Sequence, residues 1–307
     1  MKRLPIMIIG VCLLAVACGT ATAGSLGPAP TTTAGPSSSA SPPGGGTAST
    51  AAAPSGQRPA TTATPTRGPA REMIGLQAWF SRNGKLFVTE RTVPATTTVG
   101  RAALDRLLTG PSTAEYAAGL RSQIPAGTTL LGVRISSGTA TVDLSSSFES
   151  AASPSAMPLR IAQVVYTLTQ FPAVTGVRFE INGQGVTVTG GVPVQSPQTR
   201  AMYSGYMPAI TVQSPVIGEQ VTSPVTVSGT ADVFEAVVSV RILDSAGNEI
   251  ARTFTTASCG TGCRGDYSVT ISYPVPRAEP GTIEVFESSA KNGLPVNVQL
   301  IPVTLAP

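Results

Sequence analysis

The chain has 307 residues, which is enough for about two domains of ordinary size. Its formal net charge of +4 comes from the first 71 residues, which hold basic but no acidic side chains, whereas basic and acidic residues nearly balance in 72–307. That balance argues against nucleic-acid binding, which needs clustered lysines and arginines on the folded part. The chain contains no histidine, which excludes Ser-His-Asp and Cys-His catalysis and imidazole metal sites.

The N-terminus has the pattern of an export signal. A short basic segment precedes the apolar residues 4–17, a stretch too short for the ~20 residues that span a bilayer. The stretch ends in Leu14-Ala15-Val16-Ala17-Cys18-Gly19. This sequence resembles the lipobox of bacterial lipoproteins, although Ala15 stands where that motif usually has leucine. The resemblance implies that residues 1–17 are removed and that Cys18 receives a diacylglyceryl group.

Two acyl chains suffice for stable anchoring, so we expect Cys18 to hold the chain on the outer face of a cytoplasmic membrane. The alternative is an ordinary signal peptide cut after Ala17 or Ala23, which would release a soluble protein. Residues 18–72 are rich in Ser, Thr, Pro, Gly and Ala and show no apolar periodicity. Because ordering them would cost backbone entropy without burial, they are predicted to form a disordered stalk.

Residues 73–190 alternate between hairpin and helix patterns. Asn83-Gly84 and Asn182-Gly183 are typical two-residue hairpin turns, and a third turn is predicted at 136–138. Apolar residues recur at helical spacing in 99–108 and in 159–171. The predicted order is ββαββαββ, an α+β domain with both helices on one side of the sheet.

Four stretches of this segment resemble the GerMN domain of sporulation and spore-germination proteins. They are Leu107-Leu108-Thr109-Gly110-Pro111, Ile124 to Leu131, Ala140 to Ser145 and Ile161 to Leu168. Together they run through nearly the whole segment in order. The resemblance implies an extracytoplasmic interaction module with no known catalysis.

Residues 208–307 show short apolar strands every 8–14 residues and no helix pattern, which is typical of a β-sandwich. Seven strands are predicted, at 210–212, 225–227, 237–243, 249–254, 267–271, 282–287 and 296–301. The stretches 223–231 and 285–293 resemble the immunoglobulin-like domain of bacterial spore germination proteins, a family that commonly follows a GerMN domain. Residues 191–207, with several prolines and tyrosines, are predicted to be the interdomain linker.

Cys259 and Cys263 lie between two predicted strands, separated by Gly-Thr-Gly. In an exported protein an even pair of cysteines indicates a disulfide. So small a closed loop is expected to contribute about 2 kcal/mol in the chain-entropy model. A redox or metal role would need further ligands, and we expect no metal site and no cofactor.

Three groups of polar residues could suggest other chemistry. Asp143 and Glu149 could act as an acid–base pair, but both lie in what is predicted to be an ordinary strand-to-helix connection. Ser288 and Lys291 match an S-x-x-K motif, yet they lie on a strand running into a turn, where the two side chains would not meet. Asp232 and Glu235 are too few for a calcium site, which takes 6–8 oxygens. The sequence therefore predicts no catalytic residue.

The main hypothesis is an envelope adaptor that binds another envelope protein or the cell-wall polymer through strand edges and loops. The alternative is an enzyme or enzyme subunit acting on peptidoglycan or lipid. A deep pocket lined by Asp143, Glu149 or Glu180 would favour that alternative. A solute-binding lipoprotein would need two large α/β lobes, which the strand order does not provide. The sequence does not indicate an oligomeric state.

Overall fold

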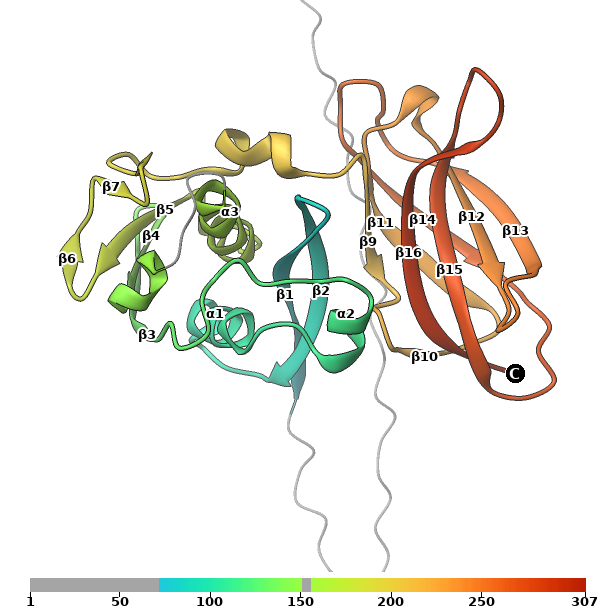
Figure 1. The fold of residues 1–307 in the computed structure, drawn as a ribbon, viewed down its shortest axis with the longest axis horizontal. Helices are drawn as coiled ribbons and strands as arrows, with labels where there is room; N and C mark the ends of the chain where they lie inside the picture. Colours follow the sequence, from blue (N-terminus) through green and yellow to red (C-terminus); the bar gives the residue numbers. More distant parts are fainter. Residues whose placement is uncertain (1–71, 151–155) are drawn as a thin grey trace, which may run out of the picture. The chain divides into compact units, whose positions relative to one another are not determined.

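The computed structural model describes residues 72–150 and 156–307, which belong to one compact unit (Figure 1). The predicted signal peptide, Cys18 and all of the predicted stalk except Glu72 lie outside the described residues. In the part of the chain that is described, no helix is both long enough and apolar enough to span a bilayer.

The first domain opens with a two-stranded antiparallel hairpin, β1 (Met73–Arg82) and β2 (Lys85–Pro94). Asn83 and Gly84 have φ angles of 52° and 72°, as the predicted two-residue turn requires. A strand with one solvent-exposed face buries every second residue. Here residues 78–81 and 86–89 are buried without a break, so both faces of the hairpin are covered.

Three α-helices follow the pattern of the sequence only in part. Helix α1 (Val99–Thr109) ends at Gly110, whose φ of 84° suits glycine. Helix α3 (Met157–Leu168) lies in the second stretch predicted to be helical and is buried at every position except Pro158. The short α2 (Thr113–Ala117) was not predicted.

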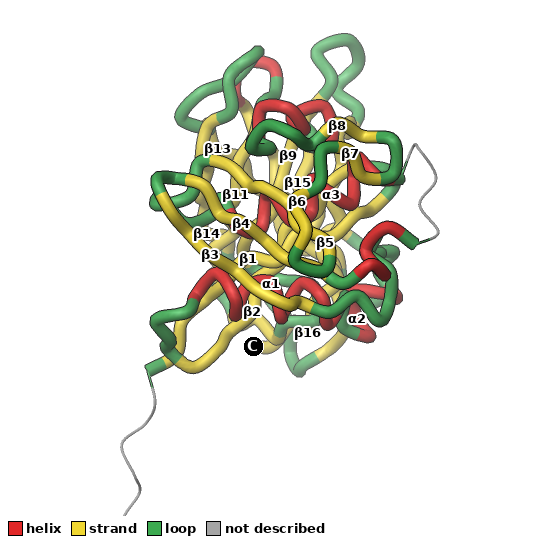
Figure 2. Tube along the Cα trace, turned by 90° about the vertical axis from the view of Figure 1, so that its left-hand side faces the viewer, coloured by secondary structure: helices red, strands yellow, loops and turns green. Residues whose placement is uncertain are grey.

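A four-stranded sheet has the order β3-β4-β5-β6 (Figure 2). Its strands are β3 (Leu130–Ser136), β4 (Thr139–Leu144), β5 (Gly176–Ile181) and β6 (Gln184–Gly185). Strands β4 and β5 are parallel, because the chain crosses over through the 3-10 helix η1 (Ser146–Glu149) and α3, while the other pairs are antiparallel.

The order ββαββαββ is confirmed, with α2 added, but the strands do not form one sheet. Helices α1 and α3 contact each other, the four-stranded sheet on one side and β1 on the other. Figure 1 shows them between the sheet and the hairpin. This position explains why α3 is buried all round: it has an apolar layer on each side.

The segment between the two domains is ordered by short elements. Strands β7 (Val188–Thr189) and β8 (Val192–Pro193) pair, and a 3-10 helix, η2 (Arg200–Tyr206), packs on α3. Tyr203 is buried there and donates a hydrogen bond to Gln198 Oε1 at 2.6 Å. Met202, by contrast, is exposed.

The second domain is the predicted sandwich, with a five-stranded sheet β10-β16-β15-β12-β13 and a three-stranded sheet β14-β11-β9. The strands are β9 (Ile210–Ser214), β10 (Gln220–Thr222), β11 (Val225–Ala231), β12 (Val237–Leu243), β13 (Glu249–Thr256), β14 (Gly265–Ile271), β15 (Glu279–Ser288) and β16 (Pro295–Ala306), with a 3-10 turn η3 (Phe234–Ala236). All seven predicted strands are present. The sequence missed β10, three residues that pair in parallel with the end of β16.

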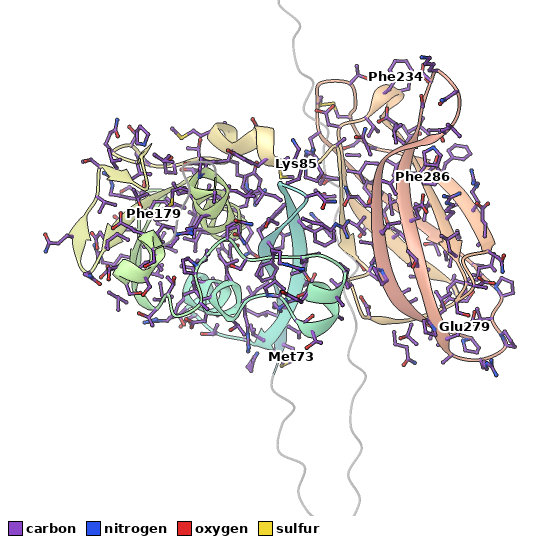
Figure 3. The ribbon with its side chains drawn as sticks, viewed as in Figure 1. Met73, Lys85, Phe179, Phe234, Glu279 and Phe286 are labelled. Atoms are coloured by element: carbon purple, nitrogen blue, oxygen red, sulfur yellow. A yellow bond between two sulfur atoms is a disulfide. The ribbon has the colours of Figure 1, made fainter. Side chains whose placement is uncertain are left out.

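The two domains pack on each other through the hairpin, and one apolar core cluster runs through both. Strand β2 contacts β9. At the turn of the hairpin, Arg82 Nη1 donates to Leu300 O at 2.9 Å, and Lys85 Nζ donates to Gly205 O at 2.7 Å. In Figure 3 the labelled Lys85 marks this end of the hairpin, while Phe179 and Phe286 mark the two domains on either side.

Candidate functional site

A cavity of about 740 Å³ lies where the first domain, η2 and the second domain meet. Strands β1 and β2 and the end of α3 line one side, and β9, β11 and β14 line the other. The side chains that build it are polar amides, two arginines, two aromatic rings and three carboxylates. Among them are Gln77, Trp79, Tyr166, Arg200, Gln213 and Arg264.

The outer edge of β1 is fixed by side chains of α3 and of the turn after it. Gln163 Nε2 donates to Trp79 O at 2.8 Å, and Thr167 Oγ1 accepts from Trp79 N at 3.2 Å. The side chain of Gln170 bonds to both the N–H and the carbonyl of Gln77, each at 2.8 Å. These bonds satisfy backbone groups that a two-stranded hairpin would leave open, and they set the position of Trp79 at the cavity.

Trp79, Tyr166 and Arg200 pack against one another on the first-domain side, with the two rings tilted by 56° to each other. The rings of Trp79 and Tyr166 lie 5.0 Å apart, and the guanidinium carbon of Arg200 lies 4.7 Å from the Tyr166 ring centroid and 5.6 Å from that of Trp79. Arg200 Nε donates to Thr169 Oγ1 at 2.7 Å, and Nη2 donates to Tyr166 O at 3.0 Å. Desolvation by burial raises the pKa of Tyr166 and lowers that of Arg200.

On the second-domain side, Arg264 is held by backbone and hydroxyl oxygens. Its Nη1 donates to Thr230 Oγ1 at 3.1 Å, and its Nη2 donates to Pro208 O at 2.5 Å. Burial lowers the pKa of Arg264, which the nearby charge of Asp232 partly offsets. The ion pairs among the described residues involve other arginines, and neither Arg200 nor Arg264 has a carboxylate partner.

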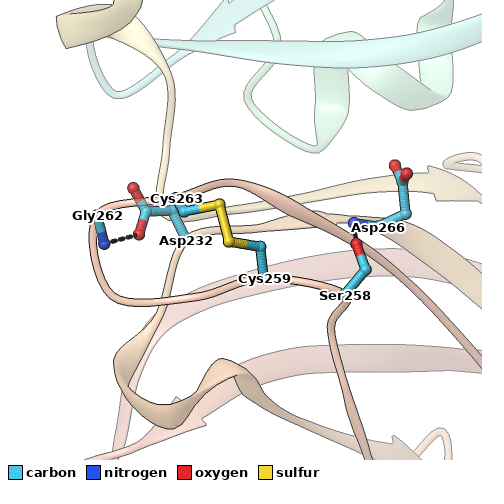
Figure 4. Close-up of a disulfide and its surroundings, with 6 residues drawn as sticks. All are labelled: Asp232, Ser258, Cys259, Gly262, Cys263 and Asp266. Atoms are coloured by element: carbon cyan, nitrogen blue, oxygen red, sulfur yellow. Dashed lines mark hydrogen bonds between the residues drawn. A yellow bond between two sulfur atoms is a disulfide. The ribbon is translucent and has the colours of Figure 1, made fainter. Parts of the chain in front are cut away.

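The loop before Arg264 is closed by a disulfide between Cys259 and Cys263 (Figure 4). Gly262 N in this loop donates to Asp232 Oδ1 at 2.8 Å. Gly265 follows, and a Cβ at that position would lie 2.1 Å from Cys259 N, so only glycine fits. The disulfide loop thus fixes a cavity edge that carries Asp232 and Arg264.

Mass spectrometry of the purified chain without reductant is expected to show Cys259 and Cys263 linked in one peptide. The spacing of the pair and their position in the structure both motivate this expectation. Two thiols that alkylate readily in the untreated protein would contradict it.

The acids considered from the sequence do not meet at the cavity. Asp143 accepts from Gly183 N at 2.9 Å, in the turn between β5 and β6. Glu149 accepts from Thr189 Oγ1 at 2.9 Å, and Glu180 pairs with Arg134 at 2.7 Å. None of the three acids lines the 740 Å³ cavity. Each has a structural partner instead.

The structure also places the other two groups of polar residues, the pair Ser288 and Lys291 and the pair Asp232 and Glu235. Ser288 is the last residue of β15 and Lys291 lies in the turn beyond it, so the S-x-x-K spacing does not lie on a helix. Within residues 72–150 and 156–307, no three side chains of His, Cys, Asp or Glu gather as a metal site would require. Asp232 is a cavity residue, and Glu235 lies in η3.

The sequence did not reveal the cavity residues. Trp79, Tyr166, Arg200 and Arg264 come from four separate segments, and no local spacing links them. The available signals were weak: a single tryptophan in the whole chain, and an arginine next to the apolar linker residues.

The fold and the cavity define a two-domain protein in which an α+β domain and an immunoglobulin-like sandwich enclose a polar cleft. Residues 79–187 match the family described as "Sporulation and spore germination", and residues 209–294 match the family described as "Immunoglobulin-like domain of bacterial spore germination". The chain therefore carries one domain of each family, and the assignment of both from the sequence is confirmed. Both family descriptions name spore germination, so the chain carries sporulation-related modules.

Several solved structures are similar to parts of the chain. The tandem GerMN domains of the sporulation protein GerM from Bacillus subtilis share 16% identity over 76% of this chain and 61% of theirs, with a TM-score of 0.38. The first GerMN domain of that protein shares 24% identity over 42% of this chain and 98% of its own, with a TM-score of 0.34. CopC from Methylosinus trichosporium OB3b shares 19% identity over 32% of this chain and 94% of its own, with a TM-score of 0.22. No curated protein matches the chain.

Proposed function

We propose that this chain is a lipid-anchored adaptor on the outer face of the cytoplasmic membrane, which binds another envelope protein or the cell-wall polymer without chemical turnover. The observation that carries the proposal is the 740 Å³ cavity, because both domains contribute its walls. Clefts between domains are a preferred place for ligand sites. A partner bound there would contact both modules at once.

The chemistry of the cavity supports binding rather than catalysis. Its lining offers amide groups, guanidinium groups and aromatic rings, which are typical of recognition surfaces. The acids that the sequence singled out, Asp143, Glu149 and Glu180, lie elsewhere and have structural partners. The cavity is lined instead by Glu90, Asp232 and Asp266. The pocket lined by Asp143, Glu149 or Glu180 that would favour an enzyme is therefore not the one found here.

Anchoring is tested by Cys18→Ala. We expect the variant to move from the membrane fraction to the medium, or to accumulate as an unprocessed precursor, because the acylated sulfur is lost. Fractionation followed by immunoblotting measures this, with Cys12→Ala, within the leader, as the matched control that should stay membrane-bound. A mature, membrane-bound Cys18→Ala protein would contradict the proposed anchor.

Binding in the cleft is tested by photo-crosslinking of the full-length chain in intact cells. A photoreactive side chain at Gln213, in the cavity lining, should form a discrete adduct with an envelope protein or wall fragment. The same side chain at Ser272, an exposed position outside the cavity lining, is the control and should not form that adduct. Identical adduct patterns at both positions, or turnover of a wall or lipid substrate by the purified chain, would contradict the proposal.

A further inference from the structure

Two arginines in the cavity are partly buried cations that form no ion pair within the described residues, although Arg264 lies near the charge of Asp232. Arg200 comes from η2 and Arg264 from the segment just before β14. Both side chains line the same cavity, Arg200 from the first-domain side, where its guanidinium carbon lies 4.7 Å from the Tyr166 ring centroid, and Arg264 from the second-domain side. Each guanidinium donates some of its five N–H groups to neutral oxygens of the protein, and its remaining N–H groups can bind a ligand.

We propose that this pair of arginines binds a carboxylate group of a peptide segment that enters the cleft. The inference rests on the proposed function, namely that the cleft is a binding site. The planar guanidinium matches a carboxylate with two parallel hydrogen bonds, and such charge-assisted bonds are stronger than neutral ones. Burial strengthens the attraction, because the partly desolvated arginines are less screened by water.

The rest of the cavity favours a peptide over a polyanion such as a phosphate polymer. Glu90, Asp232 and Asp266 also line it, and they would repel a ligand with many negative charges. A peptide instead brings one carboxylate for the arginines and N–H donors for these acids. The side chains of Gln77 and Gln213 make no hydrogen bond to other described residues, and each offers a donor and an acceptor for a peptide group.

The chain contains its own reporter for this site. Trp79 is its only tryptophan, and it lies in the cavity wall beneath Arg200. Its intrinsic fluorescence should therefore change when a ligand binds at Arg200, and no second tryptophan contributes to the signal. Calorimetry on the same samples provides a second measurement that does not depend on the fluorophore.

The experiment uses the full-length chain in detergent and three tetrapeptide probes. They are acetyl-tetraalanine with a free C-terminal carboxylate, the same peptide as its amide, and an amide peptide with one internal glutamate. We expect one or both carboxylate peptides to bind at least about tenfold more tightly than the neutral amide, because a hydrogen-bonded ion pair is lost in the amide. The two acidic probes distinguish a chain terminus from an acidic side chain as the source of the carboxylate.

Variants then test the arginines. Arg264→Gln and Arg200→Gln should each weaken binding of the acidic peptide about tenfold or more and leave the neutral peptide unaffected. Arg277→Gln, which removes the same charge from an exposed residue outside the cavity, is the matched control and should bind like the unaltered chain. Circular dichroism checks the fold of each variant, and Arg264→Gln decides the question if Arg200→Gln does not fold.

Three results would overturn the inference. The first is equal affinity for acidic and neutral peptides, which includes no response from any probe. The second is unchanged affinity in folded Arg264→Gln. The third is displacement of the peptide by inorganic phosphate at lower concentration than by acetate. If the Gln213 crosslink persists in both arginine variants, the carboxylate assignment fails while the adaptor function stands; if the unaltered chain forms no such adduct, the function itself fails.

Discussion

Replacement of Glu115 by glutamine is expected to lower the free energy of unfolding by about 3–5 kcal/mol, the cost of breaking a buried ion pair. Glu115 is only 1% exposed. Its two oxygens accept from Arg91 at 2.8 and 2.5 Å, from Thr89 Oγ1 at 2.5 Å and from Ser112 N at 2.7 Å. Glutamine keeps the shape but leaves Arg91 without its counter-charge. Urea unfolding at neutral pH measures the change.

The same pair makes stability depend on pH. Burial acts to raise the pKa of Glu115, but the hydrogen bonds from Arg91, Thr89 and Ser112 outweigh it and hold the pKa below the ordinary 4.5. The charged form is therefore stabilised by folding, so the contribution is present above about pH 4.5 and is lost as the pH falls through the folded-state pKa. We expect the stability difference between the unaltered chain and Glu115→Gln to shrink in acid.

A matched control is Glu180→Gln, which breaks the pair with Arg134, an arginine whose side chain is 65% exposed. Exposed pairs contribute about 0–1 kcal/mol, so this variant should unfold almost like the unaltered chain. An equal decrease in the free energy of unfolding in the two variants would show that the buried Glu115 pair stabilises the fold no more than the exposed pair does.

Replacement of Gln163 by leucine is expected to lower the free energy of unfolding by about 2–4 kcal/mol, because a buried backbone carbonyl and a half-buried backbone N–H lose their partner. Gln163 Nε2 donates to Trp79 O at 2.8 Å, and its Oε1 accepts from Gln123 N at 2.7 Å. Leucine has a similar size and satisfies neither group. Unfolding followed by the fluorescence of Trp79 reports on this part of the chain directly.

Gln170→Leu is the comparison for that variant. Its bonds to Gln77 lie at a half-buried position beside the cavity, where water can replace them. The variant should therefore lower the free energy of unfolding by only about 1 kcal/mol. If Gln163→Leu costs no more than Gln170→Leu, the side chains of α3 do not hold the edge of β1 in the way described above.

Local signals predicted the elements that local chemistry determines. The Asn-Gly pairs at 83–84 and 182–183 require positive φ angles, and both adopt them. Strand β10 and helix α2 are too short for periodicity to appear. Strand β10 pairs with the distant β16, and α2 is tied to β2 through Glu115 and Arg91. The capping box Ser112–Glu115 was a visible sign of α2 that periodicity did not capture.

The separate position of the hairpin could not be predicted, because it depends on how layers pack. The hairpins β1-β2 and β3-β4 have similar sequence patterns, but the first forms a sheet of its own and the second belongs to the four-stranded sheet. The difference lies in the contacts of β1-β2 with α3 and β9, which no local pattern shows. The cavity has the same origin. Trp79 and Arg264 line the same cleft because the domains dock, and nothing in the sequence around either residue indicates the other.

The hairpin that opens the first domain is covered by segments made much later. Gln163 and Gln170, which close the edge of β1, follow their partners by 84 and 93 residues, and β9 begins later still. An isolated two-stranded hairpin is marginally stable in water at best. During synthesis from the N-terminus, β1 and β2 can pack on α1 first, but the apolar surface that α3 and β9 cover stays open until those segments have emerged. The first part of the domain to be made therefore completes its packing only after α3 and β9 have been made, and a nascent chain that stops before residue 163 lacks the side chains that close the edge of β1.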